Sequence, residues 1–210
     1  MIKKLIFDVD NTLIDFPKEY VRGYQEVLDK NNIKKSFIDL YNALGKYETC
    51  GLYKYYKIED VLNLINKELG LNLDKKFSDD YFKMYDNLIT PVSDSTIKTL
   101  EYLSKKYELL VLSNWFTKSQ ENRLRKAGLL KYFTKVYGTD IVPMKPLEDS
   151  FLSVVGDLKV EECAMIGDNF DVDIKVPYEL GMNVFYLNKD GIKVPNITTI
   201  KSIDELKEML

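Results

Sequence analysis

Short apolar runs alternate with helical patterns along most of the chain. The runs expected to form strands cover residues 3–7, 109–112, 135–137, 163–166 and 183–187. Between these runs, apolar residues return every three or four positions, as at Ile97, Leu100 and Leu103, which is the spacing of one face of a helix. Strands that alternate with helices predict an α/β fold with a doubly wound parallel sheet.

The segment from Pro17 to about Ile89 has a different pattern, in which runs of strand type are replaced by helical periods. The first of these periods comprises Tyr20, Val21, Tyr24, Val27 and Leu28. An all-helical block between the first strand and the rest of an α/β pattern predicts an inserted domain. We therefore expect an α/β core of residues 1–15 and 91–210 and a helical domain of residues 16–90.

The charge balance argues against nucleic acid as a partner. The chain has 210 residues, with 30 Lys and Arg against 33 Asp and Glu and a formal net charge of -3. Its basic residues form no run that resembles a track for a phosphate backbone. The first apolar run is interrupted by Asp8, too soon for a signal peptide or a membrane span. We expect a cytoplasmic protein without a membrane partner, as a monomer or a weak homodimer.

Histidine is absent from the sequence, and only two cysteines occur. The lack of histidine excludes nucleophile pairs of the Ser/His or Cys/His kind and every imidazole acid or base. Cys50 and Cys163 are far apart and have no partner motif, which argues against a disulfide framework or a zinc site. Proton transfer in this protein must therefore use carboxylates, lysine, tyrosine or water.

Polar residues follow the predicted strands at the positions where parallel sheets bind ligands. They are Asp8, Asp10 and Thr12 after the first strand, Ser113 and Asn114 after the second, Lys145 after the third, and Gly167, Asp168 and Asp173 after the fourth. Taken singly, each group is more often an ordinary turn or helix cap. All four groups in this order, each at a predicted strand end, are far less probable by chance.

The four acids of this set predict a metal site. Asp8, Asp10, Asp168 and Asp173 would repel one another strongly in a partly dry crevice, so that the group requires a cation. Carboxylate oxygens without His or Cys ligands favour magnesium, which is usually held jointly with a substrate phosphate. Lys145 would add a fixed positive charge for the oxygens of a transferring phosphoryl group.

The segments FDVDNTL, LSNW, MKP and IGDNFDVD resemble the four motifs of the haloacid dehalogenase superfamily of phosphatases. The resemblance covers nearly the whole chain and implies a Rossmann-like core, with the helical block as the cap inserted after the first motif. It implies that Asp8 is the nucleophile and Asp10 the general acid and base. The phosphoryl group would be bound by Ser113, Asn114 and Lys145.

The resemblance also implies how magnesium is held. Asp8 and Asp168 would ligate the ion together with the backbone carbonyl of Asp10, and Asp173 would support it directly or through water. The predicted function is that of a magnesium-dependent phosphatase, which hydrolyses a small phosphorylated metabolite through an aspartyl-phosphate intermediate.

Other reactions of the superfamily, and one other class of protein, use similar residues. The true dehalogenases lack an acid two residues beyond the nucleophile, so that Asp10 argues against their chemistry. A phosphonatase would need a Schiff-base lysine from the cap, where Lys46, Lys54 and Lys57 are candidates. A phosphomutase uses the same core residues and differs in how the cap excludes water. A non-catalytic, receiver-like phosphoacceptor module is less favoured, because its phosphoacceptor follows a mid-chain strand, where this chain has Ser113.

Two departures from the family pattern and one specificity hypothesis complete the prediction. Asn11 stands where glycine is commonest, although asparagine tolerates a left-handed turn. The family's small pair after the last motif is replaced by residues 175–177, Lys-Val-Pro. Tyr53 and Tyr55 of the cap, with Trp115 after the second strand, are candidates for contact with the substrate. Their alternative role is packing between helices.

Overall fold

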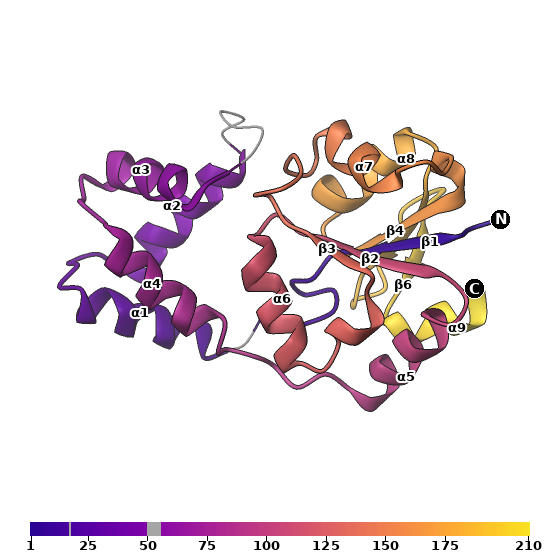
Figure 1. The fold of residues 1–210 in the computed structure, drawn as a ribbon, viewed down its shortest axis with the longest axis horizontal. Helices are drawn as coiled ribbons and strands as arrows, with labels where there is room; N and C mark the ends of the chain where they lie inside the picture. The colour runs from indigo at the N-terminus through magenta and orange to yellow at the C-terminus, as the bar shows by residue number, and fades with distance from the viewer. Residues whose placement is uncertain (17, 50–55) are drawn as a thin grey trace. The chain divides into compact units, whose positions relative to one another are not determined.

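The computed structural model describes residues 1–16, 18–49 and 56–210. The chain forms two compact units (Figure 1), one of residues 1–15 and 90–210 and the other of residues 16–89. A helix with the length and apolar character needed to cross a bilayer does not occur in the described part of the chain. The longer unit is an α/β core unit, and the shorter one is a helical unit.

The core unit contains a six-stranded sheet in the order β3-β2-β1-β4-β5-β6, with every pairing parallel. Its strands are β1 (Lys4–Phe7), β2 (Glu108–Leu112), β3 (Lys135–Tyr137), β4 (Cys163–Gly167), β5 (Asn183–Leu187) and β6 (Thr198–Ile200). The predicted parallel α/β fold is confirmed. Strand β6 was not predicted, because this edge strand has only three residues and buries only Ile200 fully, which leaves no apolar run to recognise.

Helices cover both faces of the sheet, as a doubly wound fold requires. They are α5 (Asp94–Leu103), α6 (Thr117–Lys126), α7 (Glu148–Val155), α8 (Lys175–Glu179) and α9 (Leu206–Met209), with short turns η1 (Leu130–Tyr132), η2 (Val160–Glu162), η3 (Phe170–Ile174) and η4 (Ile203–Glu205). Leu5 and Phe7 of β1 belong to the core that α5, α6 and α9 cover, whereas Ile6 belongs to the core under α7. Figure 1 shows α7 and α8 on one side of the sheet and α5 and α9 on the other.

The register of the sheet brings the ends of the central strands together. Phe7 of β1 lies opposite Val111 of β2 and Ile166 of β4. Because these strands are parallel, the chain leaves all three at the same edge of the sheet. Asp8 and Asp168 therefore start from neighbouring points on that edge.

The helical unit consists of α1 (Tyr20–Lys30), α2 (Phe37–Thr49), α3 (Ile58–Leu69) and α4 (Lys75–Tyr85) among its described residues. Helix α1 packs on α4, and α2 packs on α3. Aromatic rings fill much of its interior. The contacts among Tyr20, Tyr24, Phe37, Tyr81 and Tyr85 are mostly edge-on, and Tyr81 stacks on Tyr85. The predicted stripe on α1 is right at four positions and wrong at Val21, which is 52% exposed. Val21 lies about 100° around the helix from Tyr20, at the edge of the stripe that the other four positions form.

Candidate active site

A tight turn follows β1 and orients the first acids. The Asp8 N–H donates to the Ile166 carbonyl at 2.9 Å, so that Asp8 is still held by the sheet. Asn11 then adopts a left-handed conformation with φ of 61°, and its N–H donates to the carbonyl of Ile14 at 2.8 Å. The prediction that asparagine can serve in place of glycine here is confirmed, since asparagine tolerates positive φ better than most residues.

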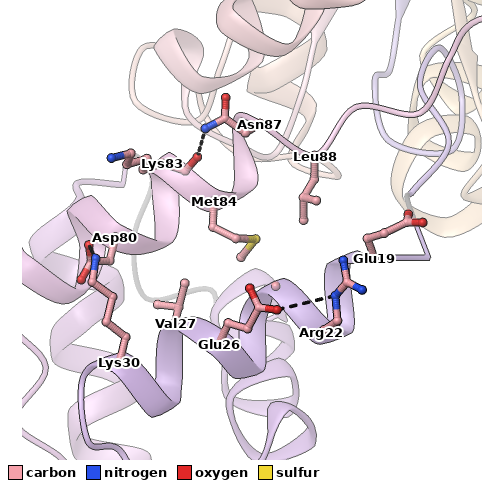
Figure 2. Close-up of a pocket in the computed structure, with 11 residues that line it drawn as sticks. Glu19, Arg22, Glu26, Val27, Lys30, Asp80, Lys83, Met84, Asn87 and Leu88 are labelled. Atoms are coloured by element: carbon pink, nitrogen blue, oxygen red, sulfur yellow. Dashed lines mark hydrogen bonds and ion pairs between the residues drawn. The ribbon is translucent and has the colours of Figure 1, made fainter.

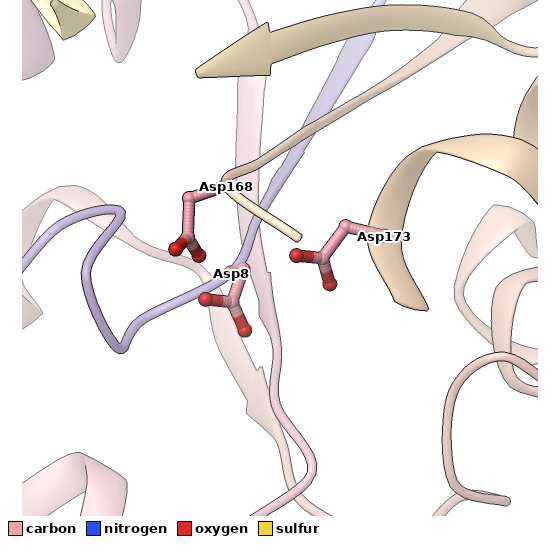
Figure 3. A group of neighbouring side chains, drawn as sticks. All are labelled: Asp8, Asp168 and Asp173. Carbon is pink, nitrogen blue, oxygen red and sulfur yellow. The ribbon is translucent and has the colours of Figure 1, made fainter. Parts of the chain in front are cut away.

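Three carboxylates meet beyond the ends of β1 and β4 (Figure 3). One oxygen from each of Asp8, Asp168 and Asp173 lies within 4.8 Å of the others. Asp8 and Asp173 are 8% and 2% exposed, and Asp168 is half-buried. Asp168 Oδ1 also accepts a hydrogen bond from Thr12 Oγ1 at 3.2 Å. The acid cluster is therefore open to solvent mainly at Asp168.

The Lys145 ammonium lies against this acid cluster. Its Nζ donates to Asp8 Oδ1 at 2.8 Å and to Asp173 Oδ1 at 2.6 Å, and the residue is only 2% exposed. The side-chain amide of Asn114 accepts from the Lys145 N–H and donates to the Lys145 carbonyl, both at 2.8 Å. Asn114, which the sequence analysis assigned to phosphate binding, thus fixes the backbone of Lys145.

The three carboxyl groups of the acid cluster face only one ammonium, that of Lys145, among the contacts described here. Burial, with the neighbouring charges of Asp173 and Asp10, raises the pKa of Asp8 to about 8, although Lys145 opposes the rise. Burial and Asp173 also raise the pKa of Asp168. Burial alone would lower the pKa of Lys145, but the carboxylates of Asp173 and Asp8 outweigh burial and raise it. Three oxygen donors of this kind with one ammonium suit a hard divalent cation such as magnesium.

Asp173 lies in the π-helical turn η3, and this conformation is frequent at functional sites. Its Oδ2 accepts from the Asn169 N–H at 3.1 Å. A Cβ at Gly167 would lie 2.4 to 2.5 Å from the Asp173 side chain, so that only glycine leaves room for this carboxylate. Helix α8 follows η3 directly, and Pro177 falls in its first turn, where a helix loses no hydrogen bond to proline.

Ser113 and Asp10 belong to a second polar group beside the acid cluster. Gln120 Nε2 donates to Ser113 Oγ at 2.9 Å and to Asp10 Oδ2 at 2.9 Å. Arg123 Nη1 donates to Asp10 Oδ1 at 2.6 Å. The Asp10 side chain is therefore directed to α6, and its carboxylate is not among the three that form the acid cluster.

Gln120 and Arg123 were not predicted as site residues, although their positions on one helix carry a signal. Gln120, Arg123 and Leu124 have the i, i+3, i+4 spacing of one helical face, and all three are 0% exposed. Polar residues at the apolar positions of a helix are rarely buried without partners. That pattern could have marked both side chains as members of a buried polar network.

The residues predicted to contact the substrate are only partly described. Tyr53 and Tyr55 lie outside the described residues, as does Lys54. Trp115 belongs to the core unit, is half-buried, and packs edge-on against Phe116 with ring centroids 5.2 Å apart. In the helical unit, Lys46 pairs with Glu68. The specificity hypothesis for the three aromatics stays a prediction.

A pocket of about 400 Å³ lies within the helical unit between α1 and α4 (Figure 2). Its apolar lining includes Val27 of α1, Met84 of α4 and Leu88. Charges of both signs alternate around it, and Arg22 pairs with Glu26 at 3.6 Å. Each of its lining residues belongs to the helical unit. The lining therefore includes none of the acids and not the lysine described above.

Comparisons with known proteins identify the family and the fold of the chain. A model of the haloacid dehalogenase-like hydrolases matches residues 2–177. The chain is 30% identical to glyceraldehyde 3-phosphate phosphatase of Methanocaldococcus jannaschii, over 100% of this chain and 97% of that protein. It is 23% identical to human N-acylneuraminate-9-phosphatase, over 91% and 84% of the two chains. The solved structure of the HAD-hydrolase YfnB from Bacillus subtilis, bound to magnesium, matches with a TM-score of 0.77 and 22% identity, over 100% and 98%.

Proposed function

The chain belongs to the haloacid dehalogenase-like hydrolases and is an enzyme of their phosphatase type, and from this premise we propose that it hydrolyses a small phosphorylated metabolite through an aspartyl-phosphate on Asp8. The observation that carries the proposal is the contact of Lys145 with Asp8 and Asp173 beside Asp168. One nucleophilic carboxylate, one fixed ammonium and two further acids are the parts that phosphoryl transfer needs.

The carboxylates of Asp8 and Asp168 and the backbone carbonyl of Asp10 would hold magnesium, with Asp173 as a direct or water-mediated support. When bound, the ion would neutralise part of the charge on the acids and on the phosphate. Lys145, buried and fixed by Asn114, would contribute the second positive charge. Ser113 would offer its hydroxyl to a phosphoryl oxygen.

In the first step, an Asp8 carboxylate oxygen attacks phosphorus and forms an acyl phosphate. The bond between phosphorus and the ester oxygen breaks, and protonated Asp10 gives its proton to the departing alkoxide. Asp10 is then a carboxylate, and the alcohol leaves. This role explains why the Asp10 side chain is turned away from the acid cluster, because a proton donor must not be occupied as a metal ligand.

In the second step, water attacks the phosphorus of the acyl phosphate. Asp10 accepts a proton from that water as the bond from phosphorus to the Asp8 oxygen breaks. Inorganic phosphate leaves, Asp8 returns to its carboxylate form, and Asp10 is protonated again. Every proton and oxygen is thus accounted for over the two steps.

The chemistry of the site and the names of two relatives support one class of substrate. The relative from Methanocaldococcus jannaschii carries the name of a triose phosphate substrate, and the human one the name of a sugar acid phosphate. Both are small phosphate monoesters of an alcohol. We place the substrate of this protein in the same class and expect it to be cytoplasmic, as we expect of the protein itself.

The test is the release of inorganic phosphate from a panel of such monoesters, with glyceraldehyde 3-phosphate included, in magnesium or in excess chelator. We expect magnesium-dependent release that Asp8→Asn lowers by about a thousandfold or more. Asp15→Asn is the matched control, because Asp15 is exposed and its carboxylate pairs with Lys189 on the surface. Full activity in chelator, or normal turnover by Asp8→Asn, would reject the proposal.

A further inference from the structure

Two side chains of α6 hold both oxygens of the Asp10 carboxylate. Arg123 Nη1 donates to Oδ1 at 2.6 Å, and Gln120 Nε2 donates to Oδ2 at 2.9 Å. Gln120 and Arg123 are each 0% exposed, whereas the Asp10 side chain is 25% exposed. The carboxylate is therefore anchored from the protein interior and keeps one side open.

The same two side chains connect Asp10 to Ser113. The amide nitrogen of Gln120 donates to Ser113 Oγ at 2.9 Å as well as to Asp10. The amide oxygen of Gln120 accepts from Arg123 Nη1 at 2.9 Å. An amide group has two N–H donors and an oxygen acceptor, so that it can make all of these bonds at once. Gln120 and Arg123 are three residues apart and so share one face of α6.

Fold stability alone does not account for this arrangement. A fully buried guanidinium loses its hydration, and apolar residues of similar volume are often as stable or more stable in such positions. What the ion pair adds is direction, because a planar guanidinium and an amide together fix the plane of the carboxylate. Orientation matters greatly for a proton donor, since a misplacement of about 1 Å can cost a hundredfold in rate.

We propose that Gln120 and Arg123 are positioning residues, which hold the Asp10 carboxylate toward the leaving-group oxygen and fix the position of the Ser113 hydroxyl relative to it. The inference rests on the proposed function and deepens it. Neither residue touches the substrate. Their effect passes through Asp10, so that it depends on how much a given reaction needs the proton that Asp10 supplies.

The test compares two esters in magnesium, p-nitrophenyl phosphate, whose leaving group hardly needs a proton, and glycerol 3-phosphate, whose leaving group does. We expect Arg123→Met to lower kcat on the alkyl ester about a hundredfold and on the aryl ester less than about tenfold. Arg123→Lys should recover part of the loss. Arg125→Met is the matched control, because Arg125 is exposed on the same helix and donates to Asn122, and it should behave as wild type on both esters.

Two further variants separate positioning from general damage. Gln120→Leu keeps the Arg123 ion pair and removes the amide link. It should also lower kcat more on the alkyl ester than on the aryl ester, but by a smaller factor than Arg123→Met. Asp10→Asn with Arg123→Met should lose little more than Asp10→Asn alone, since both act through one group. Melting temperature and circular dichroism establish that each variant is folded. If Arg123→Met does not fold, the kcat values of Gln120→Leu and Arg123→Lys on the two esters test the inference instead.

Equal losses on the two esters in folded variants, or additive losses in the double variant, would overturn the inference while the proposed function stands. A wild-type protein without magnesium-dependent activity on these two esters and on every other monoester of the panel would overturn the proposed function and this inference with it. The outcome for wild type thus separates the failure of one from the failure of the other.

Discussion

The core unit and the helical unit differ in where their charged side chains lie. In the core unit, Asp8, Asp173, Lys145 and Arg123 are buried and pair with other members of the site. In the helical unit, described ion pairs such as Lys75 with Asp79 lie on the surface. The interior of the helical unit is built from aromatic rings instead.

This difference indicates which buried residues serve activity and which serve stability. Burying charge carries a desolvation penalty that pairing offsets only in part, so the core unit gives up stability to keep its polar site. Packed rings contribute by apolar burial and by edge-on contacts, and they leave no reactive group. Substitutions of buried polar residues in the core unit should therefore change activity more than stability, and those in the helical unit should do the reverse.

The largest effect in this comparison is expected from Lys145→Met, which removes the buried ammonium at nearly constant volume. We expect kcat/KM to fall about a hundred- to a thousandfold, because a preorganised charge facing the phosphoryl group is lost. Asp8 and Asp173 would then face each other without their partner. Magnesium should accordingly raise the melting temperature of the variant more than that of wild type.

Steady-state kinetics and thermal unfolding with and without magnesium check this prediction. Turnover within about tenfold of wild type would mean that Lys145 is a structural residue. The expected difference between the two units would then fail for the residue that should show it most clearly.

The next largest effect is expected from replacing a glycine of the core unit by alanine, and the same replacement in the helical unit is its comparison. In Gly167→Ala, the new Cβ would lie 2.4 Å from Asp173 Cβ, so that the carboxylate must move, and we expect magnesium affinity to fall about tenfold or more. In Gly23→Ala, the new Cβ would meet the flexible Met84 side chain at 3.1 Å. That change should shift stability by about 1 kcal/mol or less and leave magnesium affinity unchanged.

Magnesium titrations of both variants, followed by activity, measure the first effect, and chemical denaturation measures the second. Equal magnesium affinities of the two variants would show that Gly167 does not serve the acid cluster.

The smallest effect is expected within the aromatic interior of the helical unit. Tyr20 and Tyr81 are buried, and their hydroxyl oxygens are 3.0 Å apart in a hydrogen bond. Tyr81→Phe removes this bond, so the free energy of unfolding should fall by about 1 kcal/mol while kcat stays at the wild-type value. Tyr20→Phe combined with Tyr81→Phe should recover part of the loss, because replacing both partners leaves less polar surface buried.

Urea denaturation of the single and double variants, with kcat measured in parallel, gives the result. A loss of turnover much greater than the loss of stability would assign a functional role to the aromatic interior and would break the contrast between the units.

Much of the fold could be predicted from the sequence, because local patterns determine it. The strands before Asp8 and Asp168 are fully buried and, apart from Lys4, consist of apolar residues and glycine, and such runs are readable without knowledge of the tertiary structure. Strand β6 was missed because Thr198 and Thr199 interrupt any apolar pattern. Its place is decided by pairing with β5, which is a tertiary contact.

The acids and Lys145 could be anticipated because each follows a strand or a loop at one edge of a parallel sheet. Gln120 and Arg123 could not be placed in the same way, since a helix carries them and only its packing directs them to Asp10. The contact that Asn114 makes could not be predicted for a related reason, and its role in phosphate binding stays a prediction. Its amide is used by the backbone of Lys145, a residue 31 positions away in the chain.

The central claim is that Asp8 carries the phosphoryl group during turnover. The most direct test is to quench the reaction of wild-type enzyme with acid during turnover of a phosphate monoester in magnesium, and to map phosphorylated peptides by mass spectrometry. We predict a phosphoryl group on Asp8, as an acyl phosphate that neutral hydroxylamine removes, and none in Asp8→Asn or in chelator. A phosphoryl group on another residue, or steady turnover by Asp8→Asn, would contradict this account.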